Sequence, residues 1–208
     1  RLSEKKQAEL EARGCTRVSQ IDDLSLLSVA QRRWVSAMRS GKPFVDEAAI
    51  RQWLGGLRWP VFSLDFETIA YAIPRWDGVR PYQQIPFQFS CHRQGPRGAR
   101  RHREYLHLGQ DDPRAALADR LIEAVEDSGS IIAWNAGFER RVIAELAEQF
   151  PRKRAALMAI ADRLVDLMDV FRKWYLHPGC LGSASIKVVA PVVLGGNGYD
   201  DLIVGAGD

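Results

Sequence analysis

The apolar residues of the first 58 positions recur at helical spacing. One face of the last helical stretch among them carries Ile50, Trp53, Leu54 and Leu57, and Gly55-Gly56 then weakens the pattern. We therefore predict a helical N-terminal extension over residues 1–58. Inside it, residues 11–24 form either a hairpin-like nucleic-acid contact or, as the pattern favours, a helical packing or linker element.

After Pro60 the pattern changes to short apolar strands that alternate with helical periods. Strands are predicted at residues 61–67, 85–92, 104–108 and 130–134, and helices at residues 111–128 and after residue 135. The second and third strands are expected to form an antiparallel hairpin with a basic loop at its tip. This order favours an α/β fold over residues 59–208, in which a mixed β-sheet is flanked by helices.

Charge and apolar run length add only a little to this picture. The net charge is +3, but basic residues gather at residues 93–103 and 152–154, where a solvated surface is the favoured explanation for each cluster alone. No apolar run approaches the ~20 residues of a membrane helix, and the first residues have no signal-peptide core. We therefore expect a cytoplasmic protein with no membrane partner.

The three cysteines are too far apart in the sequence to suggest a shared site. Cys15, Cys91 and Cys180 fit neither a disulfide framework nor a zinc motif, so we expect them to be reduced and packed.

The first candidate chemistry is the pair of acids at the end of the strand over residues 61–67. Side chains two apart in a strand point to one face, so Asp65 and Glu67 should project together, away from Leu64. Two carboxylates this close repel each other unless a cation lies between them. The ordinary alternative is an exposed strand end.

The second candidate is the segment from Asn135 to Glu139, where a predicted strand turns into a helix. Sites in open α/β sheets form at such positions. Ordinary helix chemistry is the alternative, because an acid in the first turn favourably meets the helix dipole and asparagine is a common cap.

Taken together, the two segments resemble the DEDD superfamily of RNase H-like 3′-to-5′ exonucleases. The resemblance covers about residues 60–175 and is carried by Asp65-Phe66-Glu67-Thr68 and by Asn135-x-x-Phe138-Glu139. Residues 10–208 also resemble an uncharacterised bacterial domain family often attached to RecB-like nucleases, through residues 80–88 and 182–187.

The resemblance implies two Mg²⁺ or Mn²⁺ ions as cofactors and three acids as catalytic metal ligands. Asp65 would bridge both ions, Glu67 would hold the ion that activates the attacking water, and Glu139 would hold the ion beside the leaving oxygen. Thr68, Asn135, Phe138 and Asp166 would support them.

Two features depart from the superfamily's pattern. It usually has aspartate where Glu139 stands, and it places a fourth carboxylate in a late helix after a His or Tyr. Asp166 resembles an acid that is not a principal ligand, and Asp169, Asp200 and Asp201 lack the preceding His or Tyr. We expect the domain to be truncated at its C-terminus and this piece alone to be weakly active or inactive.

The expected partner is single-stranded DNA or RNA, with a RecB-like nuclease domain in the same polypeptide as a further candidate. Arg80, Tyr82 and Lys187 are the predicted nucleic-acid contacts, each with a solvated surface as its alternative. The leading hypothesis is metal-dependent phosphodiester hydrolysis at 3′ ends. The alternatives are a catalytically incomplete nucleic-acid-binding module and a structural module of a larger nuclease or DNA-repair protein.

Overall fold

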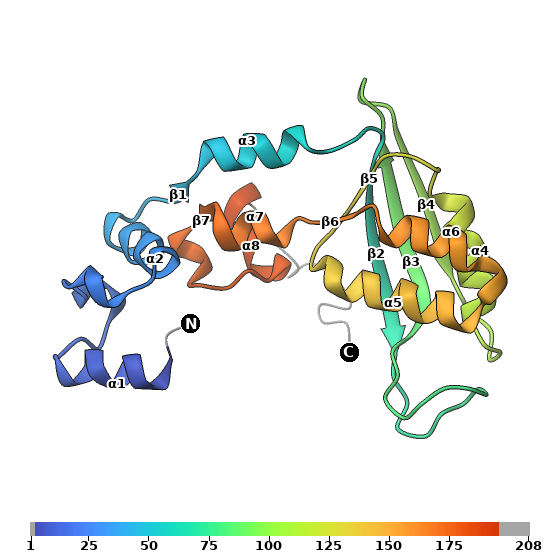
Figure 1. Cartoon of the computed structure of the whole chain (residues 1–208), viewed down its shortest axis with the longest axis horizontal. Coiled ribbons are helices and arrows are strands. Elements are labelled where there is room, and N and C mark those ends of the chain that lie inside the picture. The colour runs from blue at the N-terminus through green and yellow to red at the C-terminus, as the bar shows by residue number, and fades with distance from the viewer. Residues whose placement is uncertain (1–2, 196–208) are drawn as a thin grey trace. The chain divides into compact units, whose positions relative to one another are not determined.

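The computed structural model describes residues 3–195, which divide into two compact units (Figure 1). The first, here called the helical unit, comprises described residues 3–52 and 168–195. The second, called the sheet unit, is Trp53–Leu167. Residues 168–195 therefore group with the N-terminal helices, whereas the sequence pattern suggested one domain from residue 59.

The α-helices of the described residues are α1 (Glu4–Ala12), α2 (Val29–Ser40), α3 (Glu47–Gly55), α4 (Arg114–Ala124), α5 (Ala136–Gln149), α6 (Arg154–Ala161), α7 (Met168–Lys173) and α8 (Ile186–Leu194). The strands are β1 (Phe44–Val45), β2 (Val61–Ile69), β3 (Ile85–Gln94), β4 (Arg100–Leu106), β5 (Ser130–Ala133), β6 (Leu164–Asp166) and β7 (Tyr175–Leu176). Short 3-10 turns lie at Val18–Gln20, Leu24–Leu26, Pro151–Lys153 and Pro178–Cys180.

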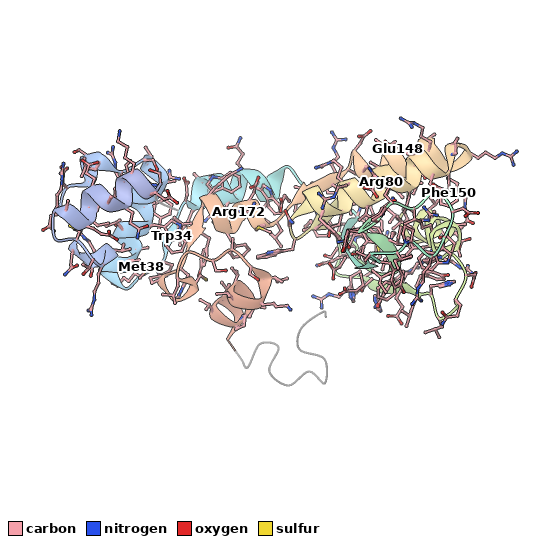
Figure 2. The ribbon with its side chains drawn as sticks, turned by 90° about the horizontal axis from the view of Figure 1, so that it is seen from below. Trp34, Met38, Arg80, Glu148, Phe150 and Arg172 are labelled. Atoms are coloured by element: carbon pink, nitrogen blue, oxygen red, sulfur yellow. The ribbon has the colours of Figure 1, made fainter. Side chains whose placement is uncertain are left out.

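The helical unit is held by a small apolar cluster and one short strand pair. Its buried cluster consists of Leu10, Ile21, Leu27 and Val35. Strand β1 pairs antiparallel with β7, so Phe44 lies opposite Leu176. Trp34 and Met38, one turn apart on α2, line an apolar groove of about 740 Å³ in this unit (Figure 2).

The sheet unit contains a five-stranded mixed sheet with the order β4-β3-β2-β5-β6. Strands β2, β3 and β4 form an antiparallel meander, while β5 runs parallel to β2 and β6 parallel to β5. The predicted α/β fold, a mixed sheet flanked by helices, is confirmed.

The two faces of this sheet differ in polarity. Phe62, Leu64 and Phe66 of β2 are at most 5% exposed and pack in one core with apolar residues of α4, α5 and α6. These three helices lie on one side of the sheet (Figure 1). Ser63, Asp65 and Glu67 alternate with the buried residues and are exposed on the other side, here called the open face.

The hairpin of β3 and β4 forms as expected, but of the basic residues only Arg97 lies in its loop. Its turn is short, since β3 ends at Gln94 and β4 begins at Arg100. The prediction of a basic loop was therefore wrong, because most of the basic residues pair with β3 along an edge strand. Charged side chains are common on edge strands, where they discourage pairing with other chains.

Helices α4 and α5 follow the predicted periods. Leu117 and Leu121 of α4, and Val142 and Ile143 of α5, are at most 2% exposed. Among residues 3–195 no helix combines the length and apolar character needed to cross a bilayer.

Candidate active site

Three parallel strands end at one edge of the sheet, here called the carboxyl edge. Ser63 of β2, Ile132 of β5 and Val165 of β6 lie level with one another, and Ala133 lies level with Asp166. Asp65 lies in β2 two residues beyond Ser63, and Asp166 is the last residue of β6, so both strands bring an acid to this edge. Ligand sites of open α/β sheets form at such an edge.

Asp65 lies on the open face, opposite Ser90 of β3. Its side chain remains accessible to solvent, but partial burial of the carboxyl by the surrounding protein raises the pKa of Asp65 above its ordinary value. Glu67 lies further along the same face, opposite Gln88. The prediction that Asp65 and Glu67 share one face of the strand is confirmed by their burial pattern.

The strand changes register immediately after these acids. A β-bulge falls between Glu67 and Thr68, and the Thr68 hydroxyl donates to Gln84 Oε1 at 2.6 Å. Bulges re-aim side chains next to functional sites. Thr68 thus ties the end of β2 to the start of β3.

The turn from β5 into α5 is fixed by Asp166. Asn135 adopts a left-handed backbone, with φ of 71°, and its side chain makes no capping hydrogen bond. Its backbone N–H instead donates to Asp166 Oδ1 at 3.1 Å, and its carbonyl accepts from the Phe138 N–H at 2.9 Å. The carboxylate of Asp166, at the end of β6, therefore fixes the position at which α5 begins.

Glu139 is buried in the first turn of α5. Only 2% of its surface is exposed, and within the described residues its Oε2 atom has no hydrogen-bond partner. Burial raises the pKa of Glu139 to about 7, its own backbone N–H opposes the rise, and the negative charges of Asp65 and Asp166 add to it. An acid that only met the helix dipole would remain solvated, so ordinary capping does not explain this burial.

The structure thus brings Asp65, Glu139 and Asp166 into one electrostatic neighbourhood at the carboxyl edge. Sequence reasoning gave Asp166 only a supporting role and missed β6 as a strand of the site. The available signal was its pattern, since Leu164-Val165-Asp166 is a shorter version of residues 61–65, which also end in an acid after apolar residues.

The donors present fit a divalent cation in chemistry, without forming a closed set of ligands. Carboxylate oxygens are the ligands that Mg²⁺ and Mn²⁺ prefer, and a cation would satisfy the lone Oε2 of Glu139. Within residues 3–195, however, no three His, Cys, Asp or Glu side chains are placed to hold an ion together. Asp65 and Glu139 are the two carboxylates here whose burial and mutual repulsion a cation would offset.

The loop between β2 and β3 reaches the same edge. Arg80 Nη2 lies 3.9 Å from Glu145 Oε1, and Gln83 Nε2 donates to Glu145 Oε2 at 2.9 Å, so α5 anchors this loop. Tyr82 is 72% exposed with φ of 58°, a backbone conformation uncommon for a non-glycine residue. An exposed ring held in this way is a candidate stacking surface.

Two other predicted residues lie outside this group. Phe138 packs partly buried against the core, with Arg141 over its ring at 5.6 Å. Lys187 lies in the first turn of α8, in the helical unit, and its contact with nucleic acid stays a prediction. Asp200 and Asp201 lie outside the described residues.

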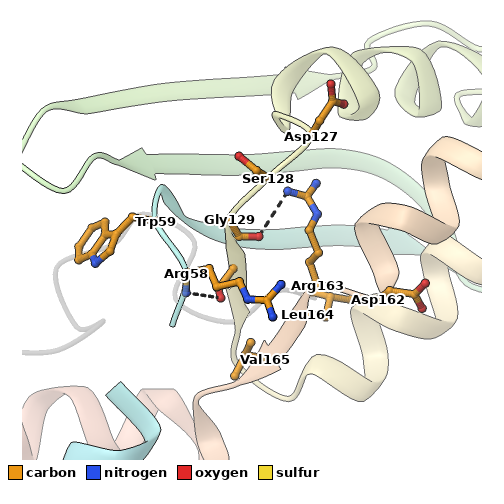
Figure 3. Close-up of a pocket in the computed structure, with 10 residues that line it drawn as sticks. Arg58, Trp59, Asp127, Ser128, Gly129, Asp162, Arg163, Leu164 and Val165 are labelled. Carbon is orange, nitrogen blue, oxygen red and sulfur yellow. Dashed lines mark hydrogen bonds between the residues drawn. The ribbon is translucent and has the colours of Figure 1, made fainter. Parts of the chain in front are cut away.

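A separate cavity of about 480 Å³ lies at the amino ends of β5 and β6 (Figure 3). The Arg58 N–H donates to Ser130 Oγ at 2.9 Å, and Arg163 Nη1 donates to the Gly129 carbonyl at 3.3 Å. These hydrogen bonds join the segment before β2 to β5 and β6. The cavity is at the edge opposite the acids, and its arginines serve the connections between strands.

Residues 62–185 match the family described as a domain of unknown function, DUF2779. No curated protein and no solved structure matched the chain.

Proposed function

The chain belongs to the DUF2779 family, and we propose that it is a metal-dependent nuclease that hydrolyses phosphodiester bonds in nucleic acid. The observation that carries this proposal is the buried Glu139, whose lone oxygen lies in the electrostatic neighbourhood of Asp65 and Asp166. Buried carboxylates without partners are costly unless a cation or proton compensates them. Their position at the carboxyl edge of an α/β sheet is where ligands bind.

The proposed ion is Mg²⁺ or Mn²⁺, held by Asp65 and Glu139 with Glu67 as a further ligand. When bound, it would supply Lewis-acid stabilisation of charge on the phosphoryl oxygens and lower the pKa of a water ligand. In the RNase H-like, DEDD-type scheme that the motifs suggest, a second ion completes the site.

The other side chains position the site and the substrate. Asp166 holds the Asn135 turn and so fixes the start of the helix that carries Glu139. Arg80 and Tyr82, on the loop at the same edge, would contact the terminal phosphate and an unpaired base. We propose single-stranded DNA or RNA as the substrate, digested from its 3′ end in the cytoplasm.

The direct test is hydrolysis of a 5′-labelled single strand in Mn²⁺ and in Mg²⁺. Asp65→Asn and Glu139→Gln are expected to lose at least about 100-fold in rate, because each removes a carboxylate that holds the ion. Glu148→Gln is the matched control, because this acid is exposed on α5 (Figure 2). Hydrolysis that survives Asp65→Asn would overturn the assignment.

A second candidate is supported by the open ligand set. Among the described residues, no three acids are placed to hold an ion together. In this second candidate function, the domain binds a strand without cleaving it, as part of a larger nuclease. Strand binding in EDTA, together with no Mn²⁺-dependent turnover by the complete natural protein, would favour this alternative. A RecB-like nuclease domain in the same polypeptide is the partner that it implies.

A further inference from the structure

A basic groove lies on the sheet unit, apart from the acids. It has a volume of about 440 Å³ and is lined by Ser63, His92, Arg93, Gln94, Arg100, Arg101 and His102. The lining contains three arginines and two histidines but no acid. This groove therefore presents positive charge to a ligand.

The groove is continuous with the face that carries Asp65. Ser63 lies opposite His92, which lies opposite His102, so these three side chains share the open face. Ser63 is two residues before Asp65, which places it ~7 Å away along β2. The groove and the acids thus occupy neighbouring rows of one sheet surface.

The two histidines form a flat aromatic surface. Their rings stack at 4.1 Å between centroids and 10° between planes, and Ser90 Oγ is hydrogen-bonded to His102 Nε2 at 2.9 Å. Glu104 Oε2 lies 3.9 Å from the same nitrogen, at the groove's margin toward Asp65. Both residues are exposed, so the pair offers a stacking surface for an unpaired base.

The arginines differ in how far their charge is already compensated. Arg93 makes two hydrogen bonds to the Glu126 carboxylate, at 2.6 and 3.1 Å. Arg100 alternates onto the open face with His102, whereas Arg101 lies opposite Arg93 and belongs to the other face of the sheet. Arg100 is exposed, and among residues 3–195 it has no acidic partner. Its guanidinium group is therefore available for phosphate oxygens, which arginine binds in a bidentate manner.

We infer that this basic groove binds the phosphodiester backbone of a single nucleic-acid strand several nucleotides away from the end held at Asp65. The inference rests on the proposed function only in placing the end of the strand at Asp65. Binding of the strand to the groove does not depend on that function. A backbone phosphate contacts Arg100, while an unpaired base stacks on the His92–His102 pair. A duplex would not present its bases to this flat surface, so the groove selects single strands.

The test is binding of a labelled single strand in EDTA, where no metal-dependent cleavage occurs. Arg100→Gln should bind about fivefold more weakly at about 0.1 M salt and reduce the slope of log K against log salt by about 0.7, since one phosphate contact is lost. His92→Ala/His102→Ala should also weaken binding about tenfold through lost stacking. The matched control is Arg152→Gln, which removes the same charge from an exposed residue just before α6.

The probes are one sequence made as single-stranded DNA, as single-stranded RNA and as a duplex. Tighter binding of either single strand supports the inference and identifies the sugar that the groove accepts. Equal weakening by the control variant, an unchanged salt slope or preferred binding of the duplex would overturn it.

Its failure is separable from failure of the proposed function. If the Arg100→Gln variant binds like the wild type while Asp65→Asn abolishes hydrolysis, the groove is wrong and the nuclease stands. If strand binding depends on the groove but hydrolysis never depends on Asp65, the groove stands and the nuclease is wrong.

Discussion

Glu139 is the residue on which the chemistry of the site depends most. Its carboxyl is buried, lacks a partner for one oxygen among the described residues, and lies near the charges of Asp65 and Asp166. Without a cation, the protein accommodates it by favouring the protonated form. The same residue should therefore make the metal-free protein sensitive to pH.

The first prediction concerns stability against pH. Because the pKa of Glu139 rises from 4.5 to about 7 in the fold, the folded state binds its proton more tightly than the unfolded chain does. Its favourable contribution is complete below pH ~4.5 and is lost as pH rises to about 7, which costs roughly 3 kcal/mol. Glu139→Gln should remove this loss. The unfolding free energy of the variant should therefore rise relative to that of the wild type as the pH increases across that range.

Urea denaturation of both proteins in EDTA, from about pH 4.5 to 8, measures this difference. Glu148→Gln, an exposed acid on the same helix, should show no such trend. If the difference in unfolding free energy between the wild type and Glu139→Gln stays constant with pH, Glu139 is not a buried, isolated carboxyl.

The second prediction concerns Asn135, which has a left-handed backbone at the turn into α5. Asn135→Gly should leave the unfolding free energy within about 0.5 kcal/mol, because glycine adopts this conformation freely. Asn135→Ala should lower it by about 1 kcal/mol, because its Cβ strains the same backbone. Since the bond to Asp166 uses the backbone N–H, equal effects of both substitutions would show that the Asn135 side chain matters instead.

At the scale of elements, the connection from α4 into β5 depends on close backbone approach. Gly129 has φ of +97°, and a Cβ built on it would lie 1.9 Å from the Pro60 carbonyl oxygen. The sequence identified Gly129 only as the end of a helical pattern. Its structural reason is the approach of β5 to the segment that enters β2.

The third prediction compares two glycines in the sheet unit. Gly129→Ala should lower the unfolding free energy by at least about 2 kcal/mol, because backbone must move. Gly137→Ala, in α5, meets no atom within 4 Å and should raise it by up to about 1 kcal/mol, since alanine favours helices. Thermal unfolding of both variants measures the contrast, and a stable Gly129→Ala protein would contradict the packing of this turn.

Periodicity in the sequence predicted the longer elements of the sheet unit and missed the shortest. The alternation of β2 and the helical faces of α4 and α5 were readable because each extends over several side chains. Strand β6 has three residues and is defined by pairing with β5, a contact that local sequence does not contain. The pair β1 and β7 has two residues each, and they lie over a hundred residues apart in sequence.

The candidate site was predictable to a similar extent. Alternation placed Asp65 and Glu67 on one face, and the strand-to-helix turn pointed to Glu139. The link from Asp166 to Asn135 depends on β6 register and could not be derived from spacing. The basic groove was also hidden, since the arginines looked like a loop until β4 paired with β3.

At the scale of the whole molecule, the near balance of charge conceals a separation of charge on the sheet surface. The net charge is +3, yet acids gather at the carboxyl edge while Arg100 and Arg101 line the groove on the same sheet. A cation bound between the acids would neutralise their negative charge, so the whole of this surface would then favour a polyanion. The arrangement agrees with a domain that guides a strand toward a metal site.

The position of a bound cation tests the central claim most directly. Crystals of the protein soaked in Mn²⁺ should show an anomalous diffraction peak at roughly 2.0–2.6 Å from carboxylate oxygens of both Asp65 and Glu139. The peak should disappear in crystals of Asp65→Asn. A Mn²⁺ ion bound elsewhere, or bound at this edge without either of these two carboxylates, would contradict the account.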